Sequence, residues 1–257
     1  MADLVLGAGG AAATAYTIDQ SLRIEKGAGL SKTPASDGDR TAWTWSGWTK
    51  NAFDWSSVED NVLFSAQHPS GAASGRFNAY FRGESPGQYL EVSQYAGSYT
   101  TQVATDAVYR DPAAWLHVVV VWDSDNGVDA DKVRIYINGE RITSLRTTNY
   151  PSAGEESSIN DDACVHVIGS RDGGFANDSI DSYLAEVYFI DGQALDADSF
   201  GETDSDTNQW KPIDASGLTF GTNGFYQKYA STELANSFED SSSTGTLKHL
   251  TFDGSND

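Results

Sequence analysis

The segment 115–122, which reads WLHVVVVW, restricts the fold more than any other part of the chain. Four consecutive valines between bulky aromatic residues are too β-branched and too few for a helix, and they are typical of a buried strand. The next apolar segment, 132–138 (KVRIYIN), alternates apolar with polar residues. Asn138 and Gly139 both tolerate the positive φ of a tight hairpin turn into residues 140–143. The sequence therefore predicts a three-stranded antiparallel unit here.

Apolar segments of strand length recur along the rest of the chain, separated by short polar, glycine-containing stretches. Further strands are predicted at 21–26, 41–48, 62–65, 77–82, 89–94, 165–169, 183–190, 217–220 and 224–229, and one short helix at 195–200. The chain has 7 Trp, 12 Tyr and 11 Phe, which can fill the space between two sheets. We therefore expect an all-β sandwich of two antiparallel sheets.

The 257 residues suit a single large sandwich with short appendages. We expect an N-terminal arm over 1–20, the sandwich domain over 21–230 and a polar C-terminal tail over 231–257. Within the tail, 247–252 is interpreted as a last strand or a contact segment. No internal repeat of 20 to 50 residues is visible, which argues against a propeller or a solenoid.

The formal net charge is −21, so the chain repels phosphate backbones and anionic lipid headgroups. No stretch approaches the ~20 apolar residues that a membrane span needs. Asp3 stands where a signal peptide carries positive charge, and the single Cys164 permits no intrachain disulfide. We expect a protein that is made in a cytoplasm, carries no signal peptide and binds neither nucleic acid nor the membrane interior.

Two longer motifs resemble a known family. WLHVVVVW and VRIYINGE, within 115–140, resemble the central hairpin of laminin-G-like and concanavalin A-like domains, and YLAEVYFIDGQAL at 183–195 resembles their penultimate strand and turn. LSKTP at 30–34, SFGE at 199–202 and GTNGFY at 221–226, together with the Trp-rich 43–48, resemble such domains in structural proteins of marine bacteriophages. The resemblance implies a jelly-roll sandwich whose concave face and rim loops hold glycans or protein partners.

The same resemblance implies a non-enzymatic protein of a virion surface, either a tail or capsid appendage or a capsid decoration protein. Such a protein is made in the host cytoplasm and released by lysis, and its partners are other virion proteins and a host-surface glycan. We expect self-association, most simply as a trimer. The alternative is a free carbohydrate-binding module or a glycoside hydrolase of the laminarinase type. Hydrolysis is disfavoured because Glu186 is followed by Val187, Tyr188 and Phe189, not by the Glu-x-Asp-x-x-Glu carboxylates of laminarinases.

The polar loop between the two central strands is a candidate calcium site. Asp123, Asp125, Asp129 and Asp131 place oxygen ligands at alternate positions around Gly127. The loop departs from the EF-hand pattern, because its glycine comes early and no glutamate closes it. A solvated hairpin connection uses the same residues, so both interpretations stay open.

A glycan site needs an aromatic platform and a few polar groups in a concave surface. Candidate ligand-binding residues, all in or beside loops, are Tyr95, Tyr99, Tyr109, Asp172, Asn177 and Trp210. The loop 170–182 that contains two of them is also a second candidate for calcium. Trp43, Trp45, Trp115 and Trp122 lie in predicted strands, and we expect them in the core.

Overall fold

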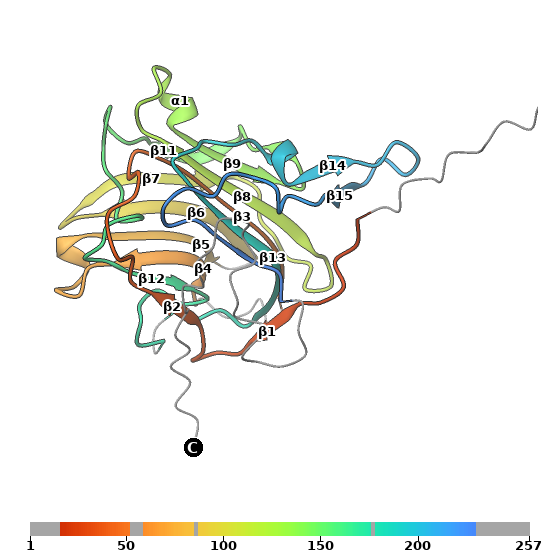
Figure 1. The fold of residues 1–257 in the computed structure, drawn as a ribbon, viewed down its shortest axis with the longest axis horizontal. Helices are drawn as coiled ribbons and strands as arrows, with labels where there is room; N and C mark the ends of the chain where they lie inside the picture. The colour runs from red at the N-terminus through yellow and green to blue at the C-terminus, as the bar shows by residue number, and fades with distance from the viewer. Residues whose placement is uncertain (1–15, 52–58, 85–86, 176–177, 230–257) are drawn as a thin grey trace, which may run out of the picture.

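The computed structural model describes residues 16–51, 59–84, 87–175 and 178–229, which form two antiparallel sheets packed face to face (Figure 1). The first sheet, sheet A, contains in spatial order β1 (Leu22–Ile24), β13 (Ser182–Asp191), β3 (Ala42–Asn51), β8 (Leu116–Asp123), β9 (Val133–Ile137) and β10 (Glu140–Arg141), and β16 (Phe225–Gln227) also pairs with β13. Sheet B contains β11 (Leu145–Asn149), β7 (Tyr99–Thr105), β6 (Gly87–Tyr95), β5 (Arg76–Glu84), β4 (Asn61–Gln67), β12 (Val165–Ile168) and β2 (Leu30–Lys32). The predicted all-β sandwich is confirmed.

The remaining elements are short. β14 (Gly201–Thr203) and β15 (Trp210–Pro212) form a separate hairpin, drawn in light blue at the upper right of Figure 1. Helical structure is restricted to α1 (Asp129–Lys132) and two 3-10 turns, η1 (Ala72–Ser74) and η2 (Ala197–Ser199). None of the helices in the described ranges has the length and apolar character needed to span a membrane.

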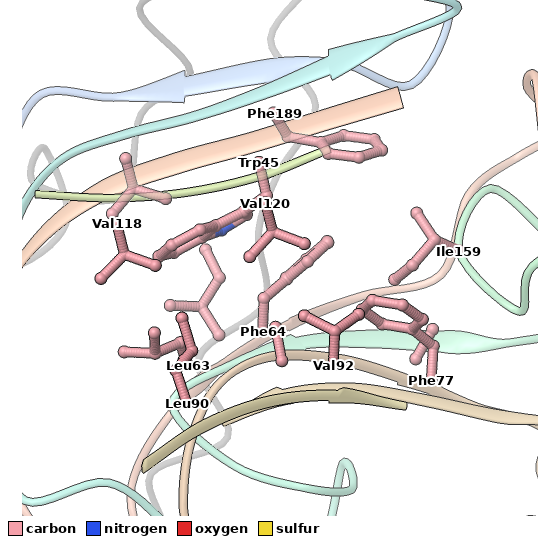
Figure 2. Packing of buried hydrophobic residues seen from close by; sticks show 14 of the residues in the cluster. Trp45, Leu63, Phe64, Phe77, Leu90, Val92, Val118, Val120, Ile159 and Phe189 are labelled. Carbon is pink, nitrogen blue, oxygen red and sulfur yellow. The ribbon is translucent and has the colours of Figure 1, made fainter. Parts of the chain in front are cut away.

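The core lies between the sheets, because alternate residues of each strand point inward. On sheet A, Trp43, Trp45 and Trp122 are fully buried, and the rings of Trp43 and Trp122 stack with centroids 6.2 Å apart. Phe64 of sheet B stacks on Trp45 from the other side (Figure 2), and Phe77 of the same sheet meets Trp43 edge-to-face at 5.0 Å. The large rings thus fill the space between the two sheets.

A second apolar cluster lies on the outer face of sheet A. Val119 and Val121, which point away from the first core, pack with Tyr188, Phe200 and Phe220. The chain that follows β13 supplies the last two of these residues and so covers this part of the sheet. The valine run of β8 is therefore buried on both faces.

Some predicted elements differ from the structure. The prediction of a strand at 217–220 is wrong, because these residues form a turn and coil. Phe220 is buried in the second apolar cluster, which explains the apolar residue at this position. The helix predicted at 195–200 shrinks to η2. The predicted last strand at 247–252, most of the predicted arm and all of the predicted tail at 231–257 lie outside the described residues.

Candidate functional site

An open pocket of about 520 Å³ lies on the outer face of sheet A, beside the second apolar cluster. Trp48 of β3 and Ala185 of β13 line it from the sheet, and Trp115 lines it just before β8 begins. The segment Tyr16–Ser21 forms one wall, and Trp210–Pro212 of β15 form another. Its volume is within the range of small-molecule sites, ~300–1,000 Å³. We call it the tryptophan pocket.

Strand alternation explains why Trp48 and Trp115 face outward. Trp48 is paired with His117 and Ala185 on the neighbouring strands, and all three side chains share the outer face. Trp115 lies on the same side as His117, and 37% of its surface is exposed. The prediction of Trp115 as a core residue was therefore wrong, whereas the predictions for Trp43, Trp45 and Trp122 are confirmed.

His117 fixes the positions of two of the tryptophans. Its ring stacks on Trp48 with centroids 4.9 Å apart and on Trp210 at 6.0 Å. The Trp210 Nε1–H donates to His117 Nδ1 over 3.0 Å, and Ser46 Oγ lies 2.8 Å from the other ring nitrogen. Burial lowers the pKa of His117 to about 3, so the ring is neutral, accepts at Nδ1 and donates from Nε2 to Ser46.

Two glycines make room for the Trp210 indole. A Cβ added at Gly139 would lie 2.3 Å from Trp210 Cε3, and one added at Gly201 would lie 2.5 Å from Trp210 Cζ2. Gly139 also has a φ of +80° in the tight turn between β9 and β10, which confirms the predicted Asn138–Gly139 turn. Two hairpin backbones thus lie so close to the indole that a side chain at either glycine position would overlap with it.

A buried glutamate binds the first residue of the segment Tyr16–Ser21, which forms one wall of the pocket. The Tyr16 hydroxyl donates to Glu186 Oε2 over 2.9 Å, and the hydroxyls of Tyr188 and Tyr226 donate to the same oxygen over 2.6 and 2.5 Å. Glu186 adopts a φ of +49° at a bulge in β13, next to Ala185 in the pocket. Burial raises the pKa of Tyr16 to about 12, so this phenol stays protonated and keeps donating.

The pocket carries little free charge. Its one lining cation, Lys211, forms ion pairs with Glu202 at 3.2 Å and Asp204 at 3.0 Å. Its one lining anion is Asp19. The lining is therefore mainly aromatic, and the polar groups at its edge suit hydrogen bonds better than binding of a single strong charge.

The structure separates the predicted ligand-binding residues. Trp210 lines the tryptophan pocket, whereas Tyr95 and Tyr99 pack against each other at the β6–β7 turn of sheet B, with centroids 5.3 Å apart. Tyr109 packs edge-to-face on Phe81, beside the core. Asp172 stabilises a turn by accepting from the Gly174 N–H, and Asn177 lies outside the described residues.

The four aspartates of the predicted calcium loop have separate partners. Asp123 accepts from Asn126 Nδ2 at 3.0 Å, and an Arg134 nitrogen lies 3.7 Å from it. Asp129 pairs with Lys132 and Asp131 with Arg141, while Asp125 is exposed. Three of the four carboxylates are thus matched with cationic or amide groups, and among the described residues these four do not gather as a metal-ligand cluster. Calcium binding by this loop stays a prediction.

The described acidic residues that do gather are Asp37, Asp161 and Asp162. Two of them already have partners: Asp37 accepts from the Asp162 N–H, and Asp161 pairs with Arg40 at 2.9 Å.

Glu91 and Glu186, two of the three buried carboxylates among the described residues, lie in different sheets. Glu91 in sheet B accepts hydrogen bonds from Tyr80, Arg82 and Gln102, while Glu186 lies in sheet A with its three tyrosines. A retaining glycosidase instead holds two carboxyl groups ~5–5.5 Å apart.

Comparison with known proteins agrees with this architecture. The model of the concanavalin A-like lectin/glucanases superfamily, in its laminin-G form, matches residues 25–199, more than half of the chain. The chain therefore belongs to this superfamily. No curated protein matches it.

Several solved structures of low identity are similar to this chain. Tailspike protein 2 of Escherichia coli O157:H7 bacteriophage CAB120 is 13% identical with a TM-score of 0.51, over 70% of this chain and 23% of the tailspike. A pentraxin from Limulus polyphemus is 17% identical with a TM-score of 0.46, over 65% of this chain and 71% of the pentraxin. Domains LG4-5 of the mouse laminin alpha1 chain are 14% identical with a TM-score of 0.47, over 77% of this chain and 48% of theirs. The chain thus matches about a quarter of the tailspike and half of the laminin segment.

Proposed function

We propose that this protein binds carbohydrate in the tryptophan pocket and does not hydrolyse it. The observation that carries the proposal is the convergence of Trp48, Trp115 and Trp210 on one open pocket. Flat aromatic rings bind the C–H face of a sugar, and nearby polar groups bind its hydroxyls. The neutral His117 and the two glycines hold Trp210 in place before any ligand arrives, which reduces the entropic cost of binding.

A glycan panel with matched variants tests this proposal. The protein is applied to immobilised oligosaccharides, and binders are measured by titration calorimetry. Trp115→Ala and Trp210→Ala should each lower affinity roughly tenfold or more, as truncation of a buried aromatic anchor does. Tyr99→Ala removes an aromatic residue that is 44% exposed on the other sheet and should change nothing.

The result that contradicts carbohydrate binding is either a panel without binders or pocket variants that bind like the unmodified protein. Circular dichroism and a thermal melt of each variant separate loss of the pocket from loss of the fold.

The absence of hydrolysis is part of the same proposal. Glu91 and Glu186 lie in different sheets and accept hydrogen bonds from surrounding side chains, which supports binding without catalysis. Incubation with laminarin and other β-glucans should release no reducing sugar. Release that disappears in a Glu91→Gln or Glu186→Gln variant would favour the alternative, a laminarinase-type hydrolase.

We further propose that the module is displayed on a virion surface, where it contacts other virion proteins and a host-surface glycan. The support is the resemblance of segments 30–34, 199–202 and 221–226 to phage structural proteins. Immunogold labelling of purified particles should place the chain on the capsid or the tail. Particles that lack the protein after purification would overturn this part of the proposal.

A further inference from the structure

A second row of side chains lies on the outer face of sheet A, next to the tryptophan pocket. Lys50 is two residues beyond Trp48 on β3, and Tyr183 is two residues from Ala185 on β13, so both share the outer face with the pocket residues. Lys50 is paired with Tyr183, and Tyr183 with Arg23 of β1. Trp115 occupies the corresponding place at the start of β8. We call Trp115, Lys50, Tyr183 and Arg23 the outer row.

The two aromatic residues of the outer row are accessible. Trp115 and Tyr183 are 37% and 36% exposed, and they are among the few large hydrophobic side chains exposed in the described part of the chain. The guanidinium of Arg23 lies 5.2 Å from the centroid of the Tyr183 ring and pairs with Asp181, which holds this ring in position. The row therefore extends the aromatic surface of the pocket toward the edge of the sheet.

Lys50 lies on β3, between the strand that Trp115 precedes and the strand that carries Tyr183. Within the described residues no ion pair involves Lys50, whereas ten of the 16 Lys and Arg side chains form one. Its ammonium group has three donors, which suit the hydroxyl and ring oxygens of a sugar.

The spacing of the row decides the size of ligand that it fits. Trp115 directly precedes β8 and Tyr183 lies in β13. β3 separates these two strands, so they are ~10 Å apart at the usual spacing of ~4.8 Å. A single pyranose ring cannot contact both aromatic residues. A short run of linked sugars can.

We propose, on the basis of the carbohydrate-binding function above, that the ligand is a linear oligosaccharide that occupies the tryptophan pocket with one end and crosses the outer row to Tyr183. The sugar in the pocket contacts Trp210 and Trp48, the next passes Trp115 and Lys50, and a later unit stacks on Tyr183. The site therefore recognises an extended glycan chain and not a terminal monosaccharide.

The test uses oligosaccharides of one to six units in three series: β-1,3-linked glucose, β-1,4-linked glucose and β-1,4-linked N-acetylglucosamine. Affinity is measured by titration calorimetry for the unmodified protein, Tyr183→Ala, Trp210→Ala and the distant Tyr99→Ala. In the series that binds, affinity should rise with length up to at least three units. Tyr183→Ala should lower affinity for the hexasaccharide roughly three- to tenfold, which corresponds to the loss of one aromatic contact.

The shortest sugar that binds should bind Tyr183→Ala as well as the unmodified protein, whereas Trp210→Ala should weaken every length. A Tyr183→Phe variant keeps the ring and should retain affinity for the hexasaccharide. If the monosaccharide binds as tightly as the hexasaccharide, or if Tyr183→Ala is neutral at every length, the extended-chain proposal is overturned while carbohydrate binding stands. If no member of any series binds, both proposals fail.

Discussion

Asp191 joins several loops at one end of the sandwich, at the end of β13. Its Oδ1 accepts from the Asp39 N–H and from Asn160 Nδ2, each over 2.8 Å, and its Oδ2 accepts from the Asn223 N–H over 2.9 Å. The residue is 5% exposed. The Asp191–Gly192 pair is typical of a turn in the sequence, but nothing in the sequence indicates the three distant donors.

We expect Asp191→Ala to lower the free energy of unfolding by about 3 kcal/mol, because three donors, two of them on the buried residues Asn160 and Asn223, lose a charged acceptor. Urea denaturation measures the change. Asp125→Ala is the matched control, since Asp125 is exposed, and it should shift stability by less than about 0.5 kcal/mol. Equal effects of the two substitutions would contradict the role given to Asp191.

The buried histidines predict a pH dependence of stability. Burial lowers the pKa of His117 to about 3 and that of His166 to about 4, whereas an unfolded histidine titrates near ~6.5. Below ~6.5 the unfolded chain takes up protons that the folded chain does not, so stability is complete above this pH and is lost as pH falls toward the folded pKa values. Each histidine should lower the free energy of unfolding at pH 5 by roughly 2 kcal/mol relative to pH 7.5.

Urea midpoints measured between pH 7.5 and 5 test this dependence. The His117→Gln variant should keep only the part of the pH dependence that His166 contributes. A flat profile in the unmodified protein would exclude buried neutral histidines. Glycan binding should persist through the same range, because His117 stays neutral and continues to accept from Trp210.

At the scale of elements, period-2 patterns predicted the strands with strong apolar alternation and missed the polar ones. The predicted unit over 115–143 is confirmed as β8, β9 and β10, adjacent in sheet A. β7 and β11 were not predicted, because YTTQVAT and LRTTN are threonine-rich and partly exposed and so lack an apolar face. Their places in the sheet come from pairing with β6 and with each other.

The spacing of the tryptophans in the sequence indicated part of the tryptophan pocket. Trp115 and Trp122 are seven positions apart and Trp45 and Trp48 three apart, so in a regular strand each pair divides between the two faces. This signal could have placed Trp115 and Trp48 outside the core. The meeting of these residues with Trp210 could not be predicted, because it depends on how the β14–β15 hairpin folds back over sheet A.

The close contact between Gly201 and Trp210 predicts that a substitution of this glycine displaces the indole. Gly201→Ala places a methyl group against the indole, so Trp210 should move and affinity for the bound glycan should fall roughly tenfold. Gly217→Ala is the matched control, since nothing lies within 4 Å of its added Cβ. Intrinsic tryptophan fluorescence and calorimetry report the two effects. Retained affinity in Gly201→Ala would mean that the position of Trp210 is not critical.

The loop between β8 and β9 predicts the outcome of metal removal. Because Asp123, Asp129 and Asp131 already have cationic or amide partners, a chelator should leave the melting temperature unchanged. Melting is compared in EDTA and in excess calcium. A melting temperature that rises in calcium, and no longer does so in Asp123→Ala, would restore the calcium site suggested by the sequence.

For the whole molecule, the dominant property is the net charge of −21 on 257 residues. Charge of one sign keeps copies apart and also opposes compaction, and both effects weaken as salt shortens the Debye length from about 30 Å at 0.01 M to about 3 Å at 1 M. The acidic surface therefore predicts that assembly depends on ionic strength. A trimer, the assembly that the sequence analysis expects, would have to bring three such charges together.

We expect sedimentation velocity to show mainly single copies at about 0.02 M sodium chloride and a growing trimer fraction toward about 0.5 M, where screening removes most of the repulsion between copies. Urea midpoints should rise over the same range, because self-repulsion within one copy is screened as well. Potassium and sodium chloride should act alike, since screening depends on ionic strength and not on the cation. Single copies at every salt concentration would contradict self-association, whereas an unchanged urea midpoint would show that the negative charges are too dispersed to oppose folding.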